Sequence, residues 1–306
     1  MIPSRIMNRA TPYLFLAPAG IVLIFALLYP IGYLTVASFF DWRMGAPFAD
    51  STFAGLGNYI WILNDPNFHE SFLVTITFAF TVVVLEMFIG VGLAFMLERP
   101  IRGMTVFRTI FILPMMIAPI VVGLVWRYMY NPQFGIINKT LKKWGFESIP
   151  WLSSPDWALP SVIIADIWQW TPFIFILSLA ALQSLPKSSI EASRIDGATG
   201  WQQIIYIKIP LMMPVLVVAA LLRMIDAFKV LEVIFIMTNG GPGLSTEILS
   251  LQIYKTAFIS WELGRAAALS NILLLIVMVI TIAMFIYTKI RDAQIARAQA
   301  AAEENY

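Results

Sequence analysis

The sequence of 306 residues contains no cysteine and a single histidine. The absence of cysteine excludes disulfide bonds, zinc–thiolate sites and a cysteine nucleophile. One histidine leaves almost no material for a metal site or a catalytic dyad. No segment matches the phosphate-binding pattern GxxxxGK[ST], so a nucleotide site of the P-loop type is not expected in this chain. We therefore expect a chain that is not an enzyme and that binds no cofactor or metal itself.

Charge is also scarce, because only 12% of the residues are Asp, Glu, Lys or Arg, whereas 59% are hydrophobic. Soluble domains carry about 25% charged residues. The net charge of +2 is close to neutral, and the basic residues form no patch with interleaved aromatics, which argues against a nucleic-acid partner. The composition indicates that most of the chain faces lipid rather than water.

Six apolar runs are each long enough to cross a bilayer, which takes about 20 residues of helix. No segment alternates apolar and polar residues over the length of a barrel strand, so we expect helices. The prediction is an all-α membrane protein in which residues 1–306 form a single transmembrane domain. The predicted spans are residues 12–40, 71–97, 106–130, 159–183, 211–238 and 265–288.

The distribution of Lys and Arg predicts the orientation of these spans. Basic residues are more frequent in the connectors that lie inside when the N-terminus is cytoplasmic. We therefore expect a multi-pass protein of a bacterial inner membrane with both termini in the cytoplasm. One exception is the group Lys139, Lys142 and Lys143, which falls in a segment, Phe134–Trp144, that is typical of an amphipathic helix on the outer surface.

The connector between the fourth and fifth spans, residues 186–210, is more structured than a simple loop. Pro186 is placed to open a helix, since proline suits the first helical turn. Gly197 and Gly200 are expected to break it, and Pro210 is expected to stop a second short helix. The apolar stripe without a long basic face favours a protein partner over lipid. The alternative is an ordinary interfacial loop.

Within this connector, three short stretches resemble the EAA loop of ABC-importer permeases. That loop has EAA, then DGA three residues on, and ends in apolar–x–apolar–Pro. Ser193 stands where the third position is usually Ala, which exchanges one small residue for another. The matching residues are Glu191, Ala192, Ser193, Asp196, Gly197, Ala198, Ile207, Ile209 and Pro210.

The resemblance to the sugar-type permeases extends over nearly the whole chain. It includes matches in the second and third spans, in the outer segment that follows them, and in the fifth span with its outer loop. These matches are Arg99-Pro100, Arg102-Gly103, Phe107-Arg108-Thr109, Leu113-Pro114, Trp126-Arg127, Pro132, Phe134-Gly135, Ile137-Asn138, Arg223, Ile225-Asp226 and Thr238–Gly243.

The resemblance implies a type I importer permease fold with a cytoplasmic coupling loop. It implies a second permease subunit, with a heterodimer as the usual arrangement, two ATPase subunits or domains that use ATP and Mg, and an external solute-binding protein. The solute would be a sugar or sugar derivative such as a disaccharide, a polyol, or a sugar bearing phosphate or sulfonate. The residues expected to contact the ATPase are Glu191, Ala192, Ser193, Asp196, Gly197, Ala198 and Pro210.

The fifth span contains charges that are costly inside a membrane, at least about 2.5–3.5 kcal/mol each at its centre. At 100° per residue, one helical face carries Arg223, Asp226, Ala227 and Val230. By analogy with the sugar-type permeases, this face would line the solute path. The alternative is a structural Arg223–Asp226 ion pair. Lys229 and Glu232 lie nearly opposite, and we expect them to pair at i,i+3.

The fourth span offers the mixture of aromatic and polar side chains that suits a carbohydrate. Asn271 of the sixth span is a further, weaker candidate for the solute path. Trp168, by contrast, is expected to pack between helices. Glu86 of the second span either faces the cavity or pairs with a charge on another span. The stripe expected to face the solute is Asp166, Gln169, Trp170 and Phe173.

A transporter of a different class is the alternative that the residues leave open. A secondary active transporter of a polar solute would need two similar halves with matching broken helices and buried ion-coupling carboxylates. The two halves of this sequence do not resemble each other, and only one contains the loop motif. The sequence therefore favours the importer subunit.

Overall fold

The computed structural model describes residues 4–98 and 103–303. Arg99, Pro100 and Arg102, which contribute to the resemblance above, lie outside the described residues. The chain divides into two compact units, one of Met1–Asp65 with Ile253–Leu274, and one of Pro66–Gln252 with Leu275–Tyr306. Within the described ranges the secondary structure is helical except for one pair of two-residue strands and one isolated bridge. The predicted all-α class is therefore confirmed.

The smaller unit combines helix α1 with a short cap. Buried Asn58 holds the cap together, because its side-chain amide donates to the carbonyl oxygens of Ser38 at 2.9 Å and Phe40 at 3.0 Å. The antiparallel strands pair Phe40 with Phe53. The elements of this unit are α1 (Ser4–Ala37), β1 (Phe40–Asp41), η1 (Phe48–Asp50), β2 (Thr52–Phe53) and α2 (Gly57–Asn64), with the end of α12 and the start of α13.

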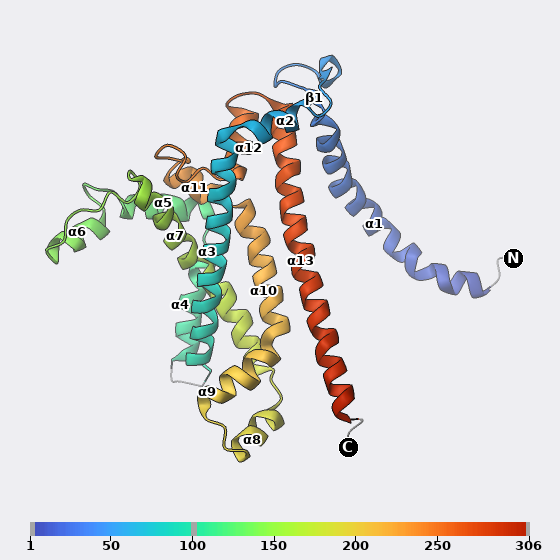
Figure 1. Cartoon of the computed structure of the whole chain (residues 1–306), viewed down its shortest axis with the longest axis vertical. Helices are drawn as coiled ribbons and strands as arrows, with labels where there is room; N and C mark the ends of the chain where they lie inside the picture. Colours follow the sequence, from blue (N-terminus) through green and yellow to red (C-terminus); the bar gives the residue numbers. More distant parts are fainter. Residues whose placement is uncertain (1–3, 99–102, 304–306) are drawn as a thin grey trace. The chain divides into compact units, whose positions relative to one another are not determined.

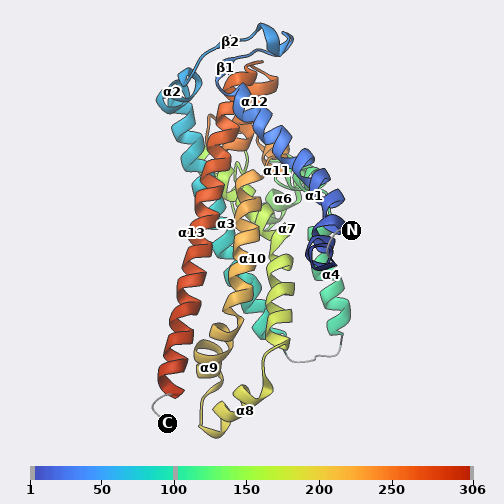
Figure 2. The same ribbon diagram turned by 90° about the vertical axis from the view of Figure 1, so that its right-hand side faces the viewer.

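The larger unit is built around α3, α7 and α10, which pack against one another (Figures 1 and 2). Helices α3, α5 and α7 begin at prolines, whose fixed φ and missing N–H suit a first helical turn. The elements are α3 (Pro66–Met96), α4 (Met104–Met116), α5 (Pro119–Met129), α6 (Ile136–Lys143), α7 (Pro155–Gln183), α8 (Lys187–Ile195), α9 (Gly200–Gln203), the π-helical segment η2 (Ile204–Lys208), α10 (Ile209–Lys229), α11 (Glu232–Met237), and parts of α12 (Leu249–Phe258) and α13 (Leu263–Glu303).

Five helices within the described residues are long and apolar enough to cross a membrane, and a bent pair makes a sixth if it is counted as one span. The predicted third span, residues 106–130, is wrong as a single helix. It consists of α4 and α5, which meet at an angle of 97°. The residue before a proline avoids the helical region, and Ala118 before Pro119 is extended accordingly, with φ −59° and ψ 134°.

The fifth span also differs from the prediction at both ends. Pro210 does not stop a helix, because α9, the π-helical segment and α10 run on as one apolar helix, Gly200–Lys229. The wider π turn just before Pro210 relieves the clash that its ring makes with a regular preceding turn. At the other end, the backbone breaks at Val230 and Leu231, so Lys229 and Glu232 lie on different helices. The expected i,i+3 pairing of those two side chains is therefore wrong.

Close packing of α3 on α7 depends on Gly90. A Cβ atom at this position would lie 2.8 Å from Ile174 side-chain carbons and 3.0 Å from the backbone nitrogen of Phe175. The two helices can approach this closely only because the glycine has no side chain, which is typical of packed membrane helices.

We predict that Gly90→Ala destabilises the larger unit by about 1–3 kcal/mol, because α3 or α7 must shift to admit the methyl group. Gly92→Ala is the matched control, since a Cβ atom there meets nothing within 4 Å. The thermal midpoint of the purified protein in mild detergent should fall for the first variant and not for the second. Equal midpoints for both variants would contradict this packing.

Candidate functional site

Arg223 of α10 lies at the centre of a buried charge cluster, which we define as Arg223, Glu86, Asp166 and Asp226. Its Nε donates to Glu86 at 2.7 Å and its Nη2 donates to the other Glu86 oxygen at 3.0 Å. Nη2 also donates to Asp166, and Nη1 donates to Asp226 at 3.3 Å. Each nitrogen of the guanidinium therefore serves a carboxylate, and the bidentate pairing with Glu86 is the geometry that Arg favours.

The cluster joins three membrane-spanning helices. Glu86 belongs to α3, Asp166 to α7 and Arg223 to α10, and their side chains are at most 2% exposed. Removing one partner from a buried pair is costly, about 3–5 kcal/mol, because the other charge stays buried without compensation. Of the two roles considered for Glu86 from the sequence, the structure shows the pairing with a charge on another span. The ion pairs of Arg223 with Glu86 and with Asp166 therefore join α3, α7 and α10 at a single point along the three helices.

The side chain of Asp226 is the accessible part of the cluster, because it is 49% exposed. The guanidinium lies over the Trp170 ring, 5.2 Å from its centre, as in a cation–π contact. Trp170 in turn meets Phe173 edge to face, with 6.5 Å between the ring centres. Two half-buried aromatic rings and one accessible carboxylate thus lie near Arg223, which has carboxylate partners for four of its five N–H groups.

The other residues expected on the solute path have different surroundings. Gln169 is buried and donates to the carbonyl oxygen of Ile117 at 3.1 Å, which satisfies a backbone group at the break between α4 and α5. Ala227 is buried, and Val230 forms the end of α10. Asn271 belongs to the smaller unit, where it donates to the Tyr59 hydroxyl at 3.1 Å.

Trp168 was expected to pack between helices; it is 41% exposed and contacts one neighbouring helix. Its ring meets that of Trp126 of α5 edge to face, with 5.8 Å between the ring centres. Within residues 4–98 and 103–303, no group of three or more His, Asp or Glu side chains is arranged to hold a metal ion.

The connector between α7 and α10 forms the helix–turn–helix that the sequence predicts. Helix α8 ends at Ile195, and Gly197 follows with φ +79°, a left-handed conformation that glycine adopts at little cost. Gly200, which was expected to help break the preceding helix, is instead the first residue of α9. Thr199 and Gln202 close a capping box on it, with the Thr199 backbone N–H donating to the Gln202 side chain at 2.7 Å.

We call residues 186–210 the coupling segment, after the coupling loop that they resemble, and several of its large apolar side chains are exposed. Ile195 is 87% exposed, and Trp201 and Tyr206 are also exposed. Glu191 and Ala192 share this accessibility. Ser193 is buried and donates to the Ile190 carbonyl oxygen at 2.7 Å. Exposed apolar side chains grouped on a polar-flanked segment are typical of a protein-binding surface.

A second ion pair fastens the coupling segment to the core of the unit. Lys208 donates to both carboxylate oxygens of Glu98, at 2.7 and 2.6 Å, and Lys208 is itself buried. From Lys208 the helix continues to Arg223 over about 22 Å, at 1.5 Å per residue. One unbroken helix thus links the coupling segment to the charge cluster.

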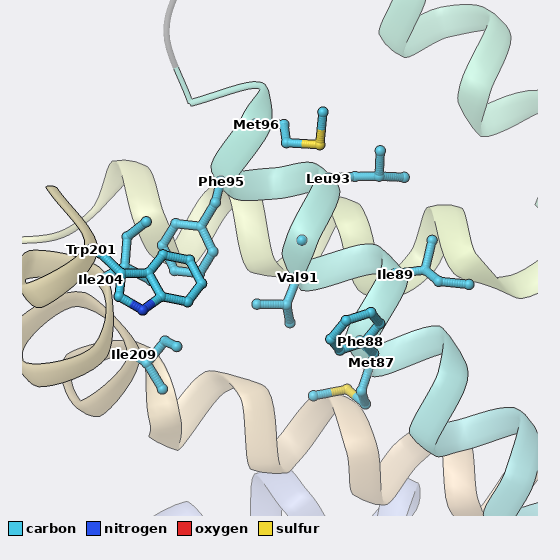
Figure 3. A pocket seen from close by; sticks show the side chains of 11 residues that line it. Met87, Phe88, Ile89, Val91, Leu93, Phe95, Met96, Trp201, Ile204 and Ile209 are labelled. Carbon is cyan, nitrogen blue, oxygen red and sulfur yellow. The ribbon is translucent and has the colours of Figure 1, made fainter.

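An apolar groove of about 740 Å³ runs between α3 and the α9–α10 region (Figure 3). The indole nitrogen of Trp201 is the single polar side-chain atom among its lining residues. A polar solute would find no hydrogen-bonding partners here apart from that atom, so the groove does not serve as a sugar path. Its lining residues are Met87, Phe88, Ile89, Val91, Gly92, Leu93, Phe95, Met96, Trp201, Ile204 and Ile209.

The sequence reasoning missed the Glu98–Lys208 pair and did not choose a partner for Glu86. A signal existed for Glu86, because a lone carboxylate in an apolar span requires a partner. Nothing in the sequence indicated that Lys208 is buried, because it lies in a connector that is expected to face the cytoplasm. Both pairs join positions more than a hundred residues apart along the chain, so only the packing of α3 on α10 reveals them.

Comparison with known proteins identifies a family model that matches residues 86–297, described as binding-protein-dependent transport system inner membrane component. A probable ABC transporter permease, y4oQ of Sinorhizobium fredii, is 36% identical over 96% of this chain and 94% of its own length. The trehalose/maltose transport system permease MalF of Thermococcus litoralis is 34% identical over 91% of this chain and 92% of its own length.

A solved structure shares the fold of the chain. It is a bacterial alginate ABC transporter in complex with an alginate pentasaccharide-bound periplasmic protein, and the matching chain is 23% identical with a TM-score of 0.77. The match covers 92% of this chain and 94% of the other. This likeness confirms the predicted type I importer permease fold.

We predict that Arg223→Ala lowers the stability of the protein by about 3–5 kcal/mol, because Glu86 and Asp166 are left buried without their partner. The measurements are the yield of folded protein and its thermal midpoint in detergent. The triple variant Arg223→Met, Glu86→Gln, Asp166→Asn should recover most of the loss, since the one carboxylate left without its partner, Asp226, is half-exposed to solvent.

Asp226→Asn is the matched control for this experiment, because its half-exposed side chain should contribute about 1 kcal/mol or less. An Arg223→Ala variant with an unchanged thermal midpoint and normal yield would contradict the structural role of the cluster.

Proposed function

The chain belongs to the binding-protein-dependent transport system inner membrane component family, and from this we propose that it is the permease subunit of an ATP-driven importer of a sugar or sugar derivative. In this proposal residues 1–306 form one permease domain with cytoplasmic termini. Hydrolysis of ATP, with Mg, is carried out by partner ATPase subunits and not by this chain.

One observation carries the proposal. The coupling segment combines the EAA-like residues with exposed apolar side chains and lies inside the region that matches the family. Glu191 and Ala192 lie on its accessible side, where an ATPase would contact them. Pro210, by contrast, lies within the continuous helix and would act by shaping the π turn next to it.

The proposed coupling mechanism follows from the continuous helix. A displacement of α8 and α9 by the ATPases acts on Lys208, which is paired with Glu98 just after the end of α3, and is transmitted along α10 to Arg223. Because Arg223 is bonded to α3 and α7, these spans would move with α10 as one body. Such rigid-body motion between packed states is a common basis of conformational switching.

The proposed solute class rests on the groups around Arg223. Aromatic faces of Trp170 and Phe173 suit the apolar faces of a sugar ring, and the accessible carboxylate of Asp226 accepts hydrogen bonds from hydroxyls. Four of the five N–H groups of Arg223 are engaged by carboxylates, and the single N–H left for a solute favours a neutral sugar over one bearing phosphate or sulfonate. The named trehalose/maltose relative is consistent with this class.

The proposed partners are a second permease subunit, two ATPase subunits or domains, and a soluble solute-binding protein on the outer side. The similar alginate transporter is in complex with a periplasmic protein, which supports the last of these.

Affinity capture of the full chain from native membranes in mild detergent tests the proposal. Mass spectrometry should identify an ATPase, a second permease and a solute-binding protein among the captured proteins. Repeated recovery of the folded chain alone would contradict the importer and favour a secondary active transporter, for which a counter-ion dependence of uptake would then be measured.

We predict that Gly197→Pro uncouples ATP hydrolysis from uptake, because proline cannot adopt the φ of +79° that turns the segment between α8 and α9. Gly200→Ala is the matched control, since a methyl group there meets nothing within 4 Å. In the reconstituted importer, the first variant should lose most solute-stimulated hydrolysis and uptake while remaining inserted.

Glu191→Lys should have the same effect through the charge of the docking surface, with Lys187→Gln on the same helix as control. Normal uptake by either Gly197→Pro or Glu191→Lys would contradict the assignment of the coupling segment.

A further inference from the structure

The charge cluster contains more acidic groups than basic ones. Three carboxyl groups, those of Glu86, Asp166 and Asp226, surround the single guanidinium of Arg223. The side chain of Asp226 is half-exposed, so water solvates its charge. The side chains of Glu86 and Asp166 are at most 1% exposed. If both were ionised, two buried negative charges would face one positive charge.

The surroundings supply no second cation. In the described part of the chain, the charged groups that act on the Glu86 and Asp166 carboxyls are Arg223, Asp226 and these two carboxyls themselves. Lys229 follows on the same helix, but it is exposed and lies on a different face from Arg223. An ionised carboxylate without a partner is strongly disfavoured in an apolar interior. The excess negative charge is therefore removed more easily by a proton than by a distant side chain.

The two buried carboxyls are also in direct contact. Nη2 of Arg223 donates to one oxygen of Glu86 at 3.0 Å and to one oxygen of Asp166, so both oxygens meet at the same nitrogen. The two carboxyls are moreover hydrogen-bonded to each other. Ionised carboxylates only accept hydrogen bonds, so a hydrogen bond between two carboxyls requires a proton on one of them.

We propose that Glu86 and Asp166 form a proton-binding site in which the two carboxyls share one proton. Adjacent carboxyl groups of this kind cannot both ionise, because like charges at contact distance repel. The pair then carries one negative charge, which Arg223 neutralises. This inference goes beyond the proposed function and does not rest on it, because it depends only on the geometry and the charges of the cluster.

The shared proton changes what the cluster presents to a solute. The buried part, made of Glu86, Asp166 and Arg223, is neutral as a whole. The net negative charge of the cluster belongs to Asp226, whose side chain is the accessible one. Helices α3, α7 and α10 therefore meet at a neutral junction, and the exposed carboxylate is available to accept hydrogen bonds.

A metal cation is the competing occupant of a site rich in carboxyls. Both oxygens of Glu86 and one oxygen of Asp166 already accept from Arg223. The other oxygen of Asp166 is buried without a hydrogen-bond partner. A single available oxygen does not suit a hard cation, which takes six or more oxygen ligands. A proton needs only the two carboxyl oxygens that share it.

The test is infrared spectroscopy of the full chain at neutral pH, in a detergent without ester groups. A protonated carboxyl has a C=O stretching band that is separate from the bands of ionised carboxylates and that shifts in D₂O. The wild type should show this band. Glu86→Gln and Asp166→Asn should each abolish it, because the new amide donates in place of the O–H group and leaves the other carboxyl ionised opposite Arg223.

Asp226→Asn is the matched control and should keep the band, since this half-exposed carboxyl is not the one that shares the proton. The thermal midpoints of the two single amide variants should stay close to that of the wild type. The midpoint of the double variant Glu86→Gln/Asp166→Asn should fall, because Arg223 then has no buried carboxylate. If a single variant does not fold, labelling the wild type with ¹³C-aspartate or ¹³C-glutamate replaces it, and at least one label should shift the band.

A wild-type spectrum without a carboxylic acid band would overturn the proposal. A band that survives in both single amide variants, or that neither label shifts, would also overturn it, because the proton would then belong to another group. These outcomes are independent of the capture experiment. Failure to capture an ATPase contradicts the proposed function, whereas the infrared band decides the proton site by itself.

Discussion

The burial of a guanidinium in a membrane-spanning helix is the constraint on which the larger unit depends. An Arg side chain at this depth is tolerated only where carboxylates and hydrogen bonds replace water. Glu86 and Asp166 supply them from two other spans, and Asp226 supplies a third carboxylate from the same helix. The positions of α3, α7 and α10 are therefore determined jointly, because displacing any one of them would leave a buried charge without its partner.

This arrangement connects the charge cluster to the coupling segment. The helix from Gly200 to Lys229 has no break between the surface at which an ATPase is proposed to act and Arg223. The breaks lie elsewhere, between α4 and α5 and between α10 and α11. Helices α5 and α11 pack against each other, with Ile236 close to Gly123 and its carbonyl oxygen accepting from Arg127 at 3.0 Å. Rigid and broken segments thus occupy different parts of the same unit.

Much of the architecture could be predicted, because bilayer thickness sets the length of an apolar run directly. The predicted first, second, fourth and sixth spans agree within a few residues with the apolar spans in α1, α3, α7 and α13, although α1 and α13 themselves are longer. The turn at Gly197 could also be predicted, since it depends on local backbone preference. The effect of each proline on its helix was harder to predict. Pro119 follows a sharp bend, whereas Pro210 lies within a continuous helix. The difference is the π turn beside Pro210.

The sequence by itself determined that this is a helical membrane protein, that a helix–turn–helix lies between the fourth and fifth spans, and that charges in the second, fourth and fifth spans needed an explanation. Those features depend on composition and on neighbours within a few residues. Only the tertiary structure decided that Arg223 bonds Glu86, Asp166 and Asp226 together, that Gln169 satisfies a carbonyl at a helix break, and that Lys208 is buried against Glu98. The reason is physical. Burial and pairing depend on which helices pack side by side, and the sequence periodicity of one helix does not indicate which other helices lie next to it.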